Sequence, residues 1–483
     1  MTYQLSKYQT DIDDKYCNTK SNLVIEAGPG SGKTFMIKYL LKKTPKFLRT
    51  ILIAFNKSIA DELSNDVPEN VRVSTIHSLA YSVLRQNIGQ NFKVNTFKNY
   101  ILGKKHLKLN HLKEKQRDIY LFTISKIIDL SRLNLCEKRE QIESICDTYN
   151  ISTINGEIDD VIKLIDHLND YNNGDHREFL IDFTDMLWLT YTKVKRVNFP
   201  KYNVVFCDEL QDLNPLQKVI VESIISPING RFIGVGDFHQ SVYSFMGSNL
   251  ESFKSFINRP NTIVLPLSVT YRCGKSIVSE ANKVFEGLES YEENVDGVVR
   301  WGTLNEVEEG DFVICRNNLP LVEAWIQIIK TNKKAHIVGK EFGQNLISIL
   351  NKLSNYPTLV EGTNALLLEK EEKLKEKGVP NPKATSNYGQ LVEKLTIIDM
   401  LSREFGSFEK LEKTINEIFN DDDRSGVMLM TGHKSKGLES DRVFFYQPEL
   451  IPSKYAQSPN EMYQEQCLRY VIITRAKKEL VYC

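Results

Sequence analysis

The feature that most constrains this chain is a glycine-rich loop, AGPGSGKT, at residues 27–34. An apolar run at 23–25 precedes the loop, and a helical pattern of apolar residues at 35–41 follows it. At such a junction between a strand and a helix, backbone N–H groups converge on phosphates. Lys33 is then expected to face the β- and γ-phosphates, and Thr34 to hold Mg²⁺. The loop therefore predicts a site for a nucleoside triphosphate.

A second motif, VVFCDELQD, lies at residues 204–212. Its four apolar residues ending at Cys207 predict a buried strand. The end of that strand would deliver Asp208 to the metal ion and Glu209 to the attacking water. A glycine-rich loop alone is often only a turn, and Ala27 stands where the general loop pattern has Gly. The agreement between the two motifs nevertheless favours phosphoryl transfer to water.

The composition is that of an ordinary globular chain with several domains. At about 100 to 200 residues per domain, 483 residues suggest roughly three or four units. The 62 acidic and 62 basic side chains balance, so the net charge does not point to a nucleic acid, although a local basic groove would suffice to bind one. The eight cysteines form no CxxC pair, which favours reduced thiols and a cytoplasmic protein. An apolar run of about 18 residues, which could span a membrane, does not occur.

Strands and helices alternate in two blocks, which predicts an α/β fold with two parallel sheets. A mainly helical insertion at about residues 81–180 interrupts the first block, and a second one at about 345–425 interrupts the second. The clearest helical spacing in the first insertion runs from 118 to 135. The strands of the first block are expected at 23–25, 51–55, 71–75, 204–207 and 232–235, and those of the second at 263–265, 312–314, 337–338, 427–430 and 443–445.

Further polar clusters follow apolar segments that are expected to be strands. They read FIGVGDFHQ at 232–240, LSVTYRC at 267–273, TGHKSKGLE at 431–439 and YVIITRA at 470–476. An arginine of the second block could supply positive charge to a γ-phosphate that the first block binds. Arg272 and Arg475 are the candidates. Taken singly, each would more often form a surface salt bridge, so their order and spacing carry the prediction.

In their order along the chain, these motifs resemble those of the UvrD/Rep/PcrA branch of superfamily 1 helicases. The resemblance covers nearly the whole length, through LSKYQ, AGPGSGKT, FNKSIADEL, STIHSLA, DFTDML, DELQD, VGDFHQSVYSF, TYRC, TGHKSKGLE and YVIITRA. It implies two RecA-like domains and two insertions. These would be domain 1A at 1–80 and 181–258, a helical 1B-like insertion at 81–180, domain 2A at 259–344 and 426–483, and a short 2B-like insertion at 345–425.

The resemblance also implies which residues bind ATP and Mg²⁺. Gln9 would contact adenine, Tyr271 would stack on it, and Glu439 would contact the ribose. Gln240 would couple the γ-phosphate to DNA, and Arg272 and Arg475 would be arginine fingers. The ATP-binding set is completed by Ala27, Gly28, Pro29, Gly30, Ser31, Gly32, Lys33 and Thr34, the catalytic set by Lys33, Asp208 and Glu209, and the metal ligands are Thr34 and Asp208.

For DNA, the resemblance implicates aromatic and polar side chains near strand ends. Aromatic rings stack on bases without regard to sequence, and hydroxyl, amide and imidazole groups can hold phosphates. An isolated histidine is more often a satisfied polar group, and two of the aromatic residues could equally belong to the core. The predicted contacts are Phe55, Asn56, Thr75, His77, Tyr243, Phe245, Thr431 and His433.

The activity that the resemblance implies is that of an ATP-dependent DNA helicase, moving 3′-to-5′ on single-stranded DNA and separating duplex. Expected partners are single-stranded DNA, its junctions with duplex, and an unidentified replication or repair protein, with the chain itself a monomer. Two alternatives stay open. One is a translocase that does not unwind duplex, and the other is a DNA-binding module that ATP switches, because Met246 stands where the family usually has Arg. RNA as the track and a phage origin are also compatible with the sequence.

Overall fold

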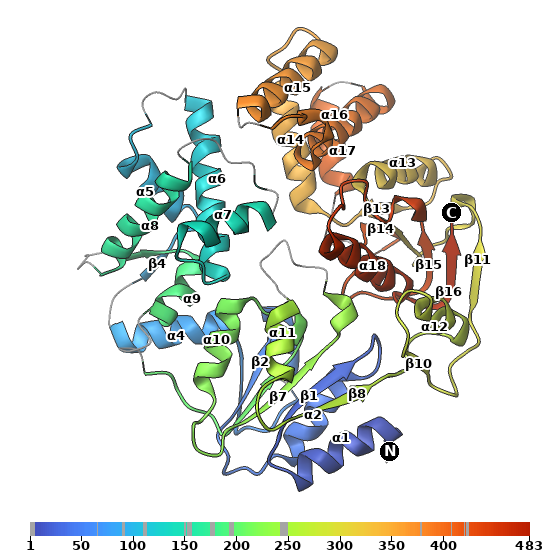
Figure 1. Ribbon diagram of the computed structural model, residues 1–483. Coiled ribbons are helices and arrows are strands. Elements are labelled where there is room, and N and C mark those ends of the chain that lie inside the picture. Colours follow the sequence, from blue (N-terminus) through green and yellow to red (C-terminus); the bar gives the residue numbers. More distant parts are fainter. Residues whose placement is uncertain are drawn as a thin grey trace. The chain divides into compact units, whose positions relative to one another are not determined.

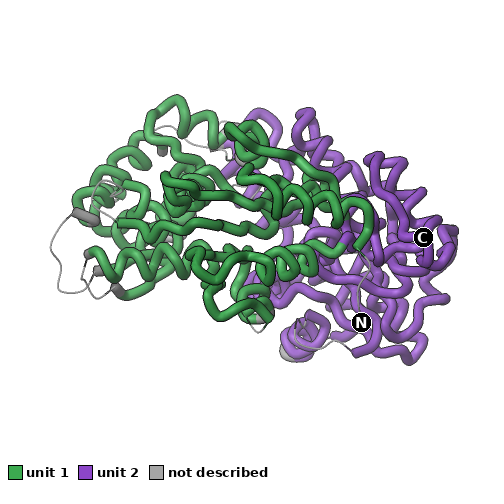
Figure 2. The backbone as a smooth tube through the Cα atoms, turned by 90° about the horizontal axis from the view of Figure 1, so that it is seen from below, with its two compact units in different colours: residues 1–28, 32–267 green, residues 29–31, 268–483 purple. Residues whose placement is uncertain are grey.

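The computed structural model describes residues 5–64, 66–88, 92–109, 114–148, 151, 157–173, 179–192, 198–241, 250–376, 379–406, 408–419, 421 and 425–483. The chain forms two compact units (Figure 2). Unit 1 comprises Met1–Gly28 and Gly32–Leu267, and unit 2 comprises Pro29–Ser31 and Ser268–Cys483. Each unit contains its own six-stranded parallel sheet, which confirms the predicted α/β fold class.

The sheet of unit 1 has the order β3-β2-β6-β7-β1-β8, and apolar side chains cover both of its faces. In β1, Leu23 and Ile25 join the core under one layer of helices, whereas Val24 joins the core on the opposite face. Helices α1 (Lys7–Asn18), α2 (Lys33–Lys43) and α3 (Lys57–Ser64) contribute to the first core, and α4 (Ile76–Ile88), α9 (Phe183–Thr192), α10 (Pro215–Ile224) and α11 (Leu250–Ile257) to the second (Figure 1). The strands are β1 (Asn22–Ala27), β2 (Thr50–Ala54), β3 (Val71–Thr75), β6 (Val204–Cys207), β7 (Arg231–Gly236) and β8 (Thr262–Leu267).

One strand prediction was wrong. The segment at 263–265 was assigned to the second block, but β8 pairs in parallel with β1, and Leu23 lies opposite Ile263. The first unit accordingly extends to Leu267 instead of ending at residue 258. The five other strands expected in this sheet all form, within a residue or two of their predicted bounds.

The first insertion is mainly helical, as predicted, and has an apolar core of its own. Ile124, Ile127 and Ile128 of α6 face Leu164 and Leu168 of α8 in this core. A two-stranded parallel ribbon, β4 with β5, brings the ends of the insertion together. Its elements are β4 (Phe92–Val94), α5 (Lys98–His106), α6 (Glu114–Leu133), α7 (Arg139–Thr148), α8 (Glu157–Asn173) and β5 (Phe179–Ile181).

A buried group of charges links this insertion to helix α9. The Nζ atom of Lys98 lies 2.7 Å from Asp185 Oδ2, and Arg132 Nη1 lies 3.0 Å from Asp185 Oδ1. All three side chains are inaccessible to solvent, at 0 to 1% exposure. Burial opposes the ionisation of Asp185, but Lys98 and Arg132 hold its pKa below the usual value. Helices α5 and α6 of the insertion are therefore tied to α9 by charges that have no access to water.

Asp182 shares this buried site in a different protonation state. The N–H of Asp185 donates to Asp182 Oδ1 at 2.6 Å, and the N–H of Asp182 donates to Asp185 Oδ2 at 3.0 Å, a reciprocal pairing at the start of α9. Burial, with the nearby charge of Asp185, raises the pKa of Asp182 to about 8. The site therefore favours the neutral form of Asp182 and the ionised form of Asp185.

The sheet of unit 2 has the order β11-β16-β15-β12-β14-β13. Its strands are β11 (Val298–Trp301), β12 (Phe312–Cys315), β13 (Ala335–Ile337), β14 (Val427–Thr431), β15 (Ser440–Phe445) and β16 (Ala476–Tyr482). Helices α12 (Lys275–Asn282), α13 (Asn318–Ile329) and α18 (Pro459–Ile473) accompany it, and a short ribbon pairs β9 (Val269–Thr270) with β10 (Glu289–Ser290). Among the residues that the structure describes, the single-turn 3₁₀ helices are η1 (Leu210–Asp212), η2 (Phe238–Gln240), η4 (Leu304–Glu306), η5 (Pro382–Ala384) and η6 (Pro448–Leu450).

The second insertion does not have a separate core. Apolar residues of its helices form one continuous cluster with those of the sheet and of α13. A β-bridge joins Ile337 to Phe419, and the Glu393 carboxylate accepts the N–H groups of Asn318 and Leu319 at 2.8 and 3.0 Å. The insertion is thus held to the sheet by apolar packing and by a cap on α13. Its helices are α14 (Lys340–Leu353), α15 (Leu359–Glu376), α16 (Ser386–Phe405) and α17 (Phe408–Ile418).

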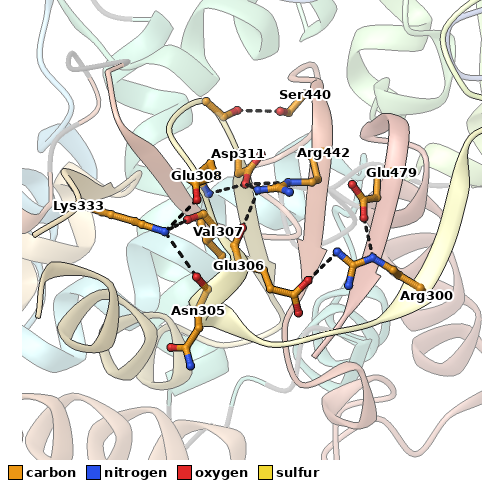
Figure 3. Close-up of polar contacts among 11 residues, drawn as sticks. Arg300, Asn305, Glu306, Val307, Glu308, Asp311, Lys333, Ser440, Arg442 and Glu479 are labelled. Carbon is orange, nitrogen blue, oxygen red and sulfur yellow. Dashed lines mark hydrogen bonds and ion pairs between the residues drawn. The ribbon is translucent and has the colours of Figure 1, made fainter. Parts of the chain in front are cut away.

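Three basic side chains hold the connection from β11 to β12 (Figure 3). Arg442 donates through Nε to Asp311 Oδ2 at 2.9 Å. Arg300 Nη2 lies 2.7 Å from Glu306 Oε2, and Lys333 donates to the Val307 carbonyl at 2.5 Å. This network satisfies acidic and backbone groups of the connection, so it has a structural role. Among the described residues, no helix is long and apolar enough to cross a membrane.

Replacing Asp185 with Ala should destabilise unit 1 strongly. The change leaves the Lys98 and Arg132 charges buried without their shared counterion, which costs about 3–5 kcal/mol. Urea unfolding followed by tryptophan fluorescence measures the loss. Asp66→Ala is the matched control, because Asp66 pairs with Lys42 at an exposed position and should leave the midpoint nearly unchanged. Equal midpoints for the two variants would contradict a structural role for the buried group.

Replacing Asp182 with Asn should make the stability of unit 1 less dependent on pH. Because the folded pKa is about 8 and the ordinary value is 3.8, the folded chain binds one proton more than the unfolded chain between these pH values. Stability contributed by Asp182 therefore falls as the pH rises through that window. Asn mimics the neutral carboxyl group, so melting temperatures at about pH 5 and about pH 8 should lie closer together than in the unmodified protein. An unaltered difference would show that Asp182 is already ionised.

Candidate nucleotide and nucleic-acid site

The glycine-rich loop has the backbone geometry that phosphate binding requires. Strand β1 ends at Ala27 and α2 begins at Lys33, as the sequence predicts. Gly30 and Gly32 adopt φ values of 67° and 84°, which L side chains rarely tolerate. No side chain caps the start of α2, so the N–H groups of its first turn are available to an anion. The remaining loop residues predicted to bind ATP are Gly28, Pro29, Ser31 and Thr34.

Two carboxylates stand at the end of β6, beside the lysine of this loop. Glu209 Oε1 lies 3.9 Å from Lys33 Nζ, and Asp208 is only 5% exposed. Burial, followed by the charge of Glu209, raises the pKa of Asp208 to about 7. The positive charge of a divalent cation would favour the ionised form of Asp208. Asp208 and Thr34 have the oxygen ligands that Mg²⁺ prefers. These residues therefore fit a magnesium ion at this position.

Glu209 has an unusual backbone conformation, and its carboxylate is held by a residue that the predictions missed. Its φ of 48° lies in the left-handed region, which is costly for a non-glycine residue and typical of functional sites. The amide of Gln211 donates to Glu209 Oε2 at 2.5 Å, and its oxygen accepts the N–H of Asp237 at 3.0 Å. Gln211 is fully buried. Its presence in the DELQD motif was the signal that could have identified it.

Gln240 continues this set of contacts from the end of β7. Its amide donates to Asp237 Oδ2 at 2.7 Å, and the other oxygen of Asp237 accepts the N–H of His239 at 2.9 Å. Glu209, Gln211, Asp237 and Gln240 thus form a hydrogen-bonded series. The structure connects the predicted water-orienting residue to the predicted coupling residue within unit 1.

Gln9 also lies beside the glycine-rich loop. A Cβ atom placed on Gly32 would lie 3.6 Å from Gln9 Nε2. The Gln9 amide oxygen accepts the N–H of Ser6, and the Ser6 hydroxyl accepts the N–H of Gln9, which closes a capping box at the start of α1. The cap fixes the orientation of the Gln9 side chain, with its amide nitrogen toward the loop.

In unit 2, the predicted residues Arg272 and Glu439 contact each other. Arg272 Nε lies 2.5 Å from Glu439 Oε2, and Lys477 Nζ lies 2.9 Å from Glu439 Oε1. Burial opposes ionisation of Glu439, but the two cations hold its pKa below the usual value. Tyr271 is half-exposed and its ring centroid lies 4.9 Å from that of Tyr291. Three of the predicted nucleotide contacts therefore neighbour one another in this unit.

The second predicted finger, Arg475, is buried within unit 2. Its Nε donates to the Val471 carbonyl at 2.9 Å and its Nη1 to the Leu438 carbonyl at 3.1 Å. The preceding segment at 470–473 was expected to be a strand, and this expectation was wrong because it forms the end of α18. Arg475 therefore begins the connection from a helix to β16.

Two of the predicted DNA contacts lie at the ends of β2 and β3 in unit 1 and cap the helices that follow. Asn56 Oδ1 accepts the N–H of Ile59, and Thr75 Oγ1 accepts the N–H of Ser78. Phe55 is 37% exposed beside Asn56. The predicted contacts Tyr243 and Phe245 lie outside the described residues.

The predicted histidines are both half-buried, and burial lowers the pKa of each. Burial lowers the pKa of His77, whose ring packs edge-on against Phe183 at 6.2 Å between centroids. Burial, with the charge of Arg316, lowers the pKa of His433 to about 4. His433 follows β14, which ends at the predicted contact Thr431. Phe183 is 53% exposed beside His77, and its position in the DFTD motif was the available signal for an additional aromatic contact.

Comparison with known proteins places these motifs in a family. A model of the UvrD/REP helicase N-terminal domain matches residues 9–261. The chain belongs to the UvrD/REP helicase family. The resemblance inferred from the order of the motifs is thereby confirmed.

Curated relatives of this UvrD/REP family member carry helicase names. F-box DNA helicase protein 1 of Schizosaccharomyces pombe is 24% identical over 546 residues, covering 99% of this chain and 57% of the relative. DNA helicase II of Escherichia coli is 24% identical, and ATP-dependent DNA helicase PcrA of Staphylococcus aureus is 25% identical. Both of these alignments cover 65% of this chain and 46% of the relative. The chain spans about half the length of these relatives.

Replacing Gln211 with Ala should slow ATP hydrolysis while ATP affinity changes little. The variant loses the contact that orients Glu209 and leaves the N–H of Asp237 unpaired, and losses of such supporting contacts typically cost about 10- to 100-fold in activity. Steady-state kinetics measure kcat and KM. Gln217→Ala is the control, because Gln217 only closes the cap of α10. A Gln211 variant with the kcat of this control would rule out the positioning role.

Proposed function

We propose that this chain is an ATP-driven motor that moves 3′-to-5′ along single-stranded DNA and separates duplex. The observation that carries the proposal is the hydrogen-bonded series from Glu209 to Gln240, which begins beside Lys33. Such a series can transmit the state of a nucleotide site to a neighbouring segment. The relatives' names as DNA helicases support the same function.

The residues of unit 1 have separate roles in ATP hydrolysis in this proposal. The N–H groups of the loop and Lys33 bind the phosphates, and Asp208 with Thr34 would hold Mg²⁺, which neutralises phosphate charge when bound. Glu209 orients the attacking water, and Gln211 keeps its carboxylate in place. Gln9 recognises adenine from the side of Gly32.

The residues of unit 2 complete the reaction in this proposal. Arg272 and Arg475 stabilise charge on the γ-phosphate, Tyr271 stacks on adenine and Glu439 contacts the ribose. Glu439 and Arg272 would then exchange their mutual contact for contacts to the nucleotide. ATP binding would thereby separate the Arg272–Glu439 ion pair of unit 2. Loss of the γ-phosphate would allow this pair to re-form.

The track is bound by side chains at strand ends. Phe55 and Phe183 offer rings to bases, and stacking of this kind does not depend on sequence. Polar groups hold the phosphates and sugars. Tyr243 and Phe245 follow Gln240 closely in the sequence, so ATP hydrolysis can be coupled to the binding of DNA. The polar contacts are Asn56, Thr75, His77, Thr431 and His433. The chain acts as a monomer on single strands and on their junctions with duplex, in replication or repair.

Hydrolysis of ATP should require Glu209 and should rise when single-stranded DNA is added. A phosphate-release assay with and without an oligodeoxynucleotide measures this stimulation. Glu209→Gln should lower kcat by about 10²- to 10⁴-fold, the usual effect of losing a general base, while ATP binding persists. No detectable hydrolysis, or a rate of hydrolysis that does not change when DNA is added, would contradict the proposed motor function.

Strand separation needs its own assay, on duplexes with either a 3′ or a 5′ single-stranded tail. Unwinding only from the 3′ tail is expected. Displacement of a bound protein from a single strand without unwinding would instead identify a translocase. Affinity for DNA that responds to ATP without stimulated hydrolysis would identify a switched binding module, and an RNA tail tests the choice of track.

A further inference from the structure

The first insertion carries an exposed aromatic and aliphatic surface, which we name the α5–α6 platform. It consists of Val94 of β4, Phe97 just before α5, Ile101 of α5, and Phe122 of α6. Phe97 is 56% exposed and Phe122 is 52% exposed. Contiguous exposed apolar groups of this kind commonly mark a binding surface. Helices α5, α6 and α8 pack together in this part of the molecule (Figure 1).

The rings of the platform are held in position by their neighbours. Phe122 stacks on Tyr100 with 4.9 Å between centroids, and Phe97 meets Phe122 edge-on at 6.5 Å. The Tyr100 hydroxyl donates to Asp118 Oδ1 at 2.5 Å, which fixes the ring beneath Phe122. The rings are therefore ordered without being buried, so binding another flat group would cost little conformational entropy.

Basic groups lie beside the platform. From residue 92 to 109 the sequence contains five lysines and no acidic residue, although Lys98 is buried and pairs with Asp185. Phe97, Ile101, Lys104 and Lys105 recur at helical spacing and so share the exposed face of α5. Lys104 and Lys105 form no ion pair with any residue that the structure describes. Lys126 extends the positive charge along α6, one turn beyond Phe122.

We propose that the α5–α6 platform binds single-stranded nucleic acid outside the predicted track, with bases on Phe97 and Phe122 and phosphates on Lys104 and Lys105. Exposed rings flanked by lysines have the chemistry of single-strand binding surfaces. Lys104 and Lys105 are exposed and pair with no described carboxylate, so their charge is complementary to a polyanion. This surface deepens the proposed motor function, on which it rests, because it would retain a strand during stepping.

Cross-linking tests the contact directly on the unmodified chain. An oligodeoxynucleotide carrying 5-iododeoxyuridine is irradiated with the full-length protein, and the attached peptides are identified by mass spectrometry. Attachment to peptides containing Phe97 or Phe122 is expected. Attachment elsewhere in the chain, with neither peptide modified, would overturn the proposal without any variant having to fold.

Affinity measurements separate stacking from charge. Phe97→Ala/Phe122→Ala should weaken binding of a labelled oligodeoxythymidylate of about 30 nucleotides by about tenfold. The slope of log K against log salt should stay the same in this variant. Lys104→Gln/Lys105→Gln should instead lower that slope by about 1.4, the value for two phosphate contacts on a single strand.

Lys46→Gln/Phe47→Ala is the matched control. Phe47 is 85% exposed in the turn before β2, at the opposite end of the sheet from the glycine-rich loop. The control should bind DNA like the unmodified protein. Phe97→Tyr/Phe122→Tyr retains the rings and should restore the affinity, which distinguishes lost stacking from a disturbed fold.

The outcomes separate the two proposals. DNA-stimulated hydrolysis in the unmodified chain, with DNA affinity unaffected by the Phe97 and Phe122 changes, would overturn the platform alone and leave the surface to a protein partner. Absent stimulation, with cross-links at the platform, would overturn the motor and retain the binding surface. Reduced affinity in both the platform variant and the control would likewise reject specific stacking at the platform.

Discussion

The burial of Asp208 is the constraint on which the nucleotide site depends. A carboxyl group at the end of an apolar strand has lost most of its water, and Glu209 adds a like charge beside it. Lys33 lies nearest to Glu209, so the pair lacks a full set of counter-charges. A divalent cation would supply the missing positive charge. Strand β6 thus belongs to a stable parallel sheet and also buries Asp208 where the carboxylate lacks a counter-charge until a cation binds.

The two insertions are attached to their sheets by different physical means. In unit 1, Lys98 and Arg132 converge on Asp185, and buried charges of this kind enforce one arrangement because every other arrangement leaves a charge unpaired. In unit 2, the insertion shares an apolar core with the sheet, and Glu393 caps α13. The first insertion has its own core and is joined to its sheet by these buried charges and by apolar contacts such as those of Leu133 and Leu135, whereas the second is continuous with its sheet. A movement of the second insertion would have to open a hydrophobic core.

The sequence could predict loops and strands that have a distinctive local pattern. It could not predict which strands pair with each other. The loop at 27–34 and the strand before Asp208 have distinctive residues at fixed spacing, so both were identified correctly. The strand at 263–265 was also identified, but its partner β1 lies about 240 residues earlier, and no local pattern indicates which sheet a strand joins. Short apolar runs also fit both helix and strand, which explains the error at 470–473. Gln211 was missed although it lies in the DELQD motif, because it acts through Glu209 and Asp237 and its contacts with them depend on the fold.

The contacts of the two predicted fingers bear on how hydrolysis could be controlled. Arg272 is neutralised by Glu439, which also holds Lys477, and the Arg475 guanidinium donates to two carbonyls within unit 2. A guanidinium has five N–H donors, so these contacts do not use all of the donors of either arginine. The Glu439 carboxylate that pairs with Arg272 is partly exposed to water and also pairs with Lys477, so this ion pair is weak. Arg475 is 1% exposed and donates to carbonyl groups inside unit 2. Its side chain is therefore held more firmly than that of Arg272, because breaking its contacts would leave buried carbonyl groups unpaired.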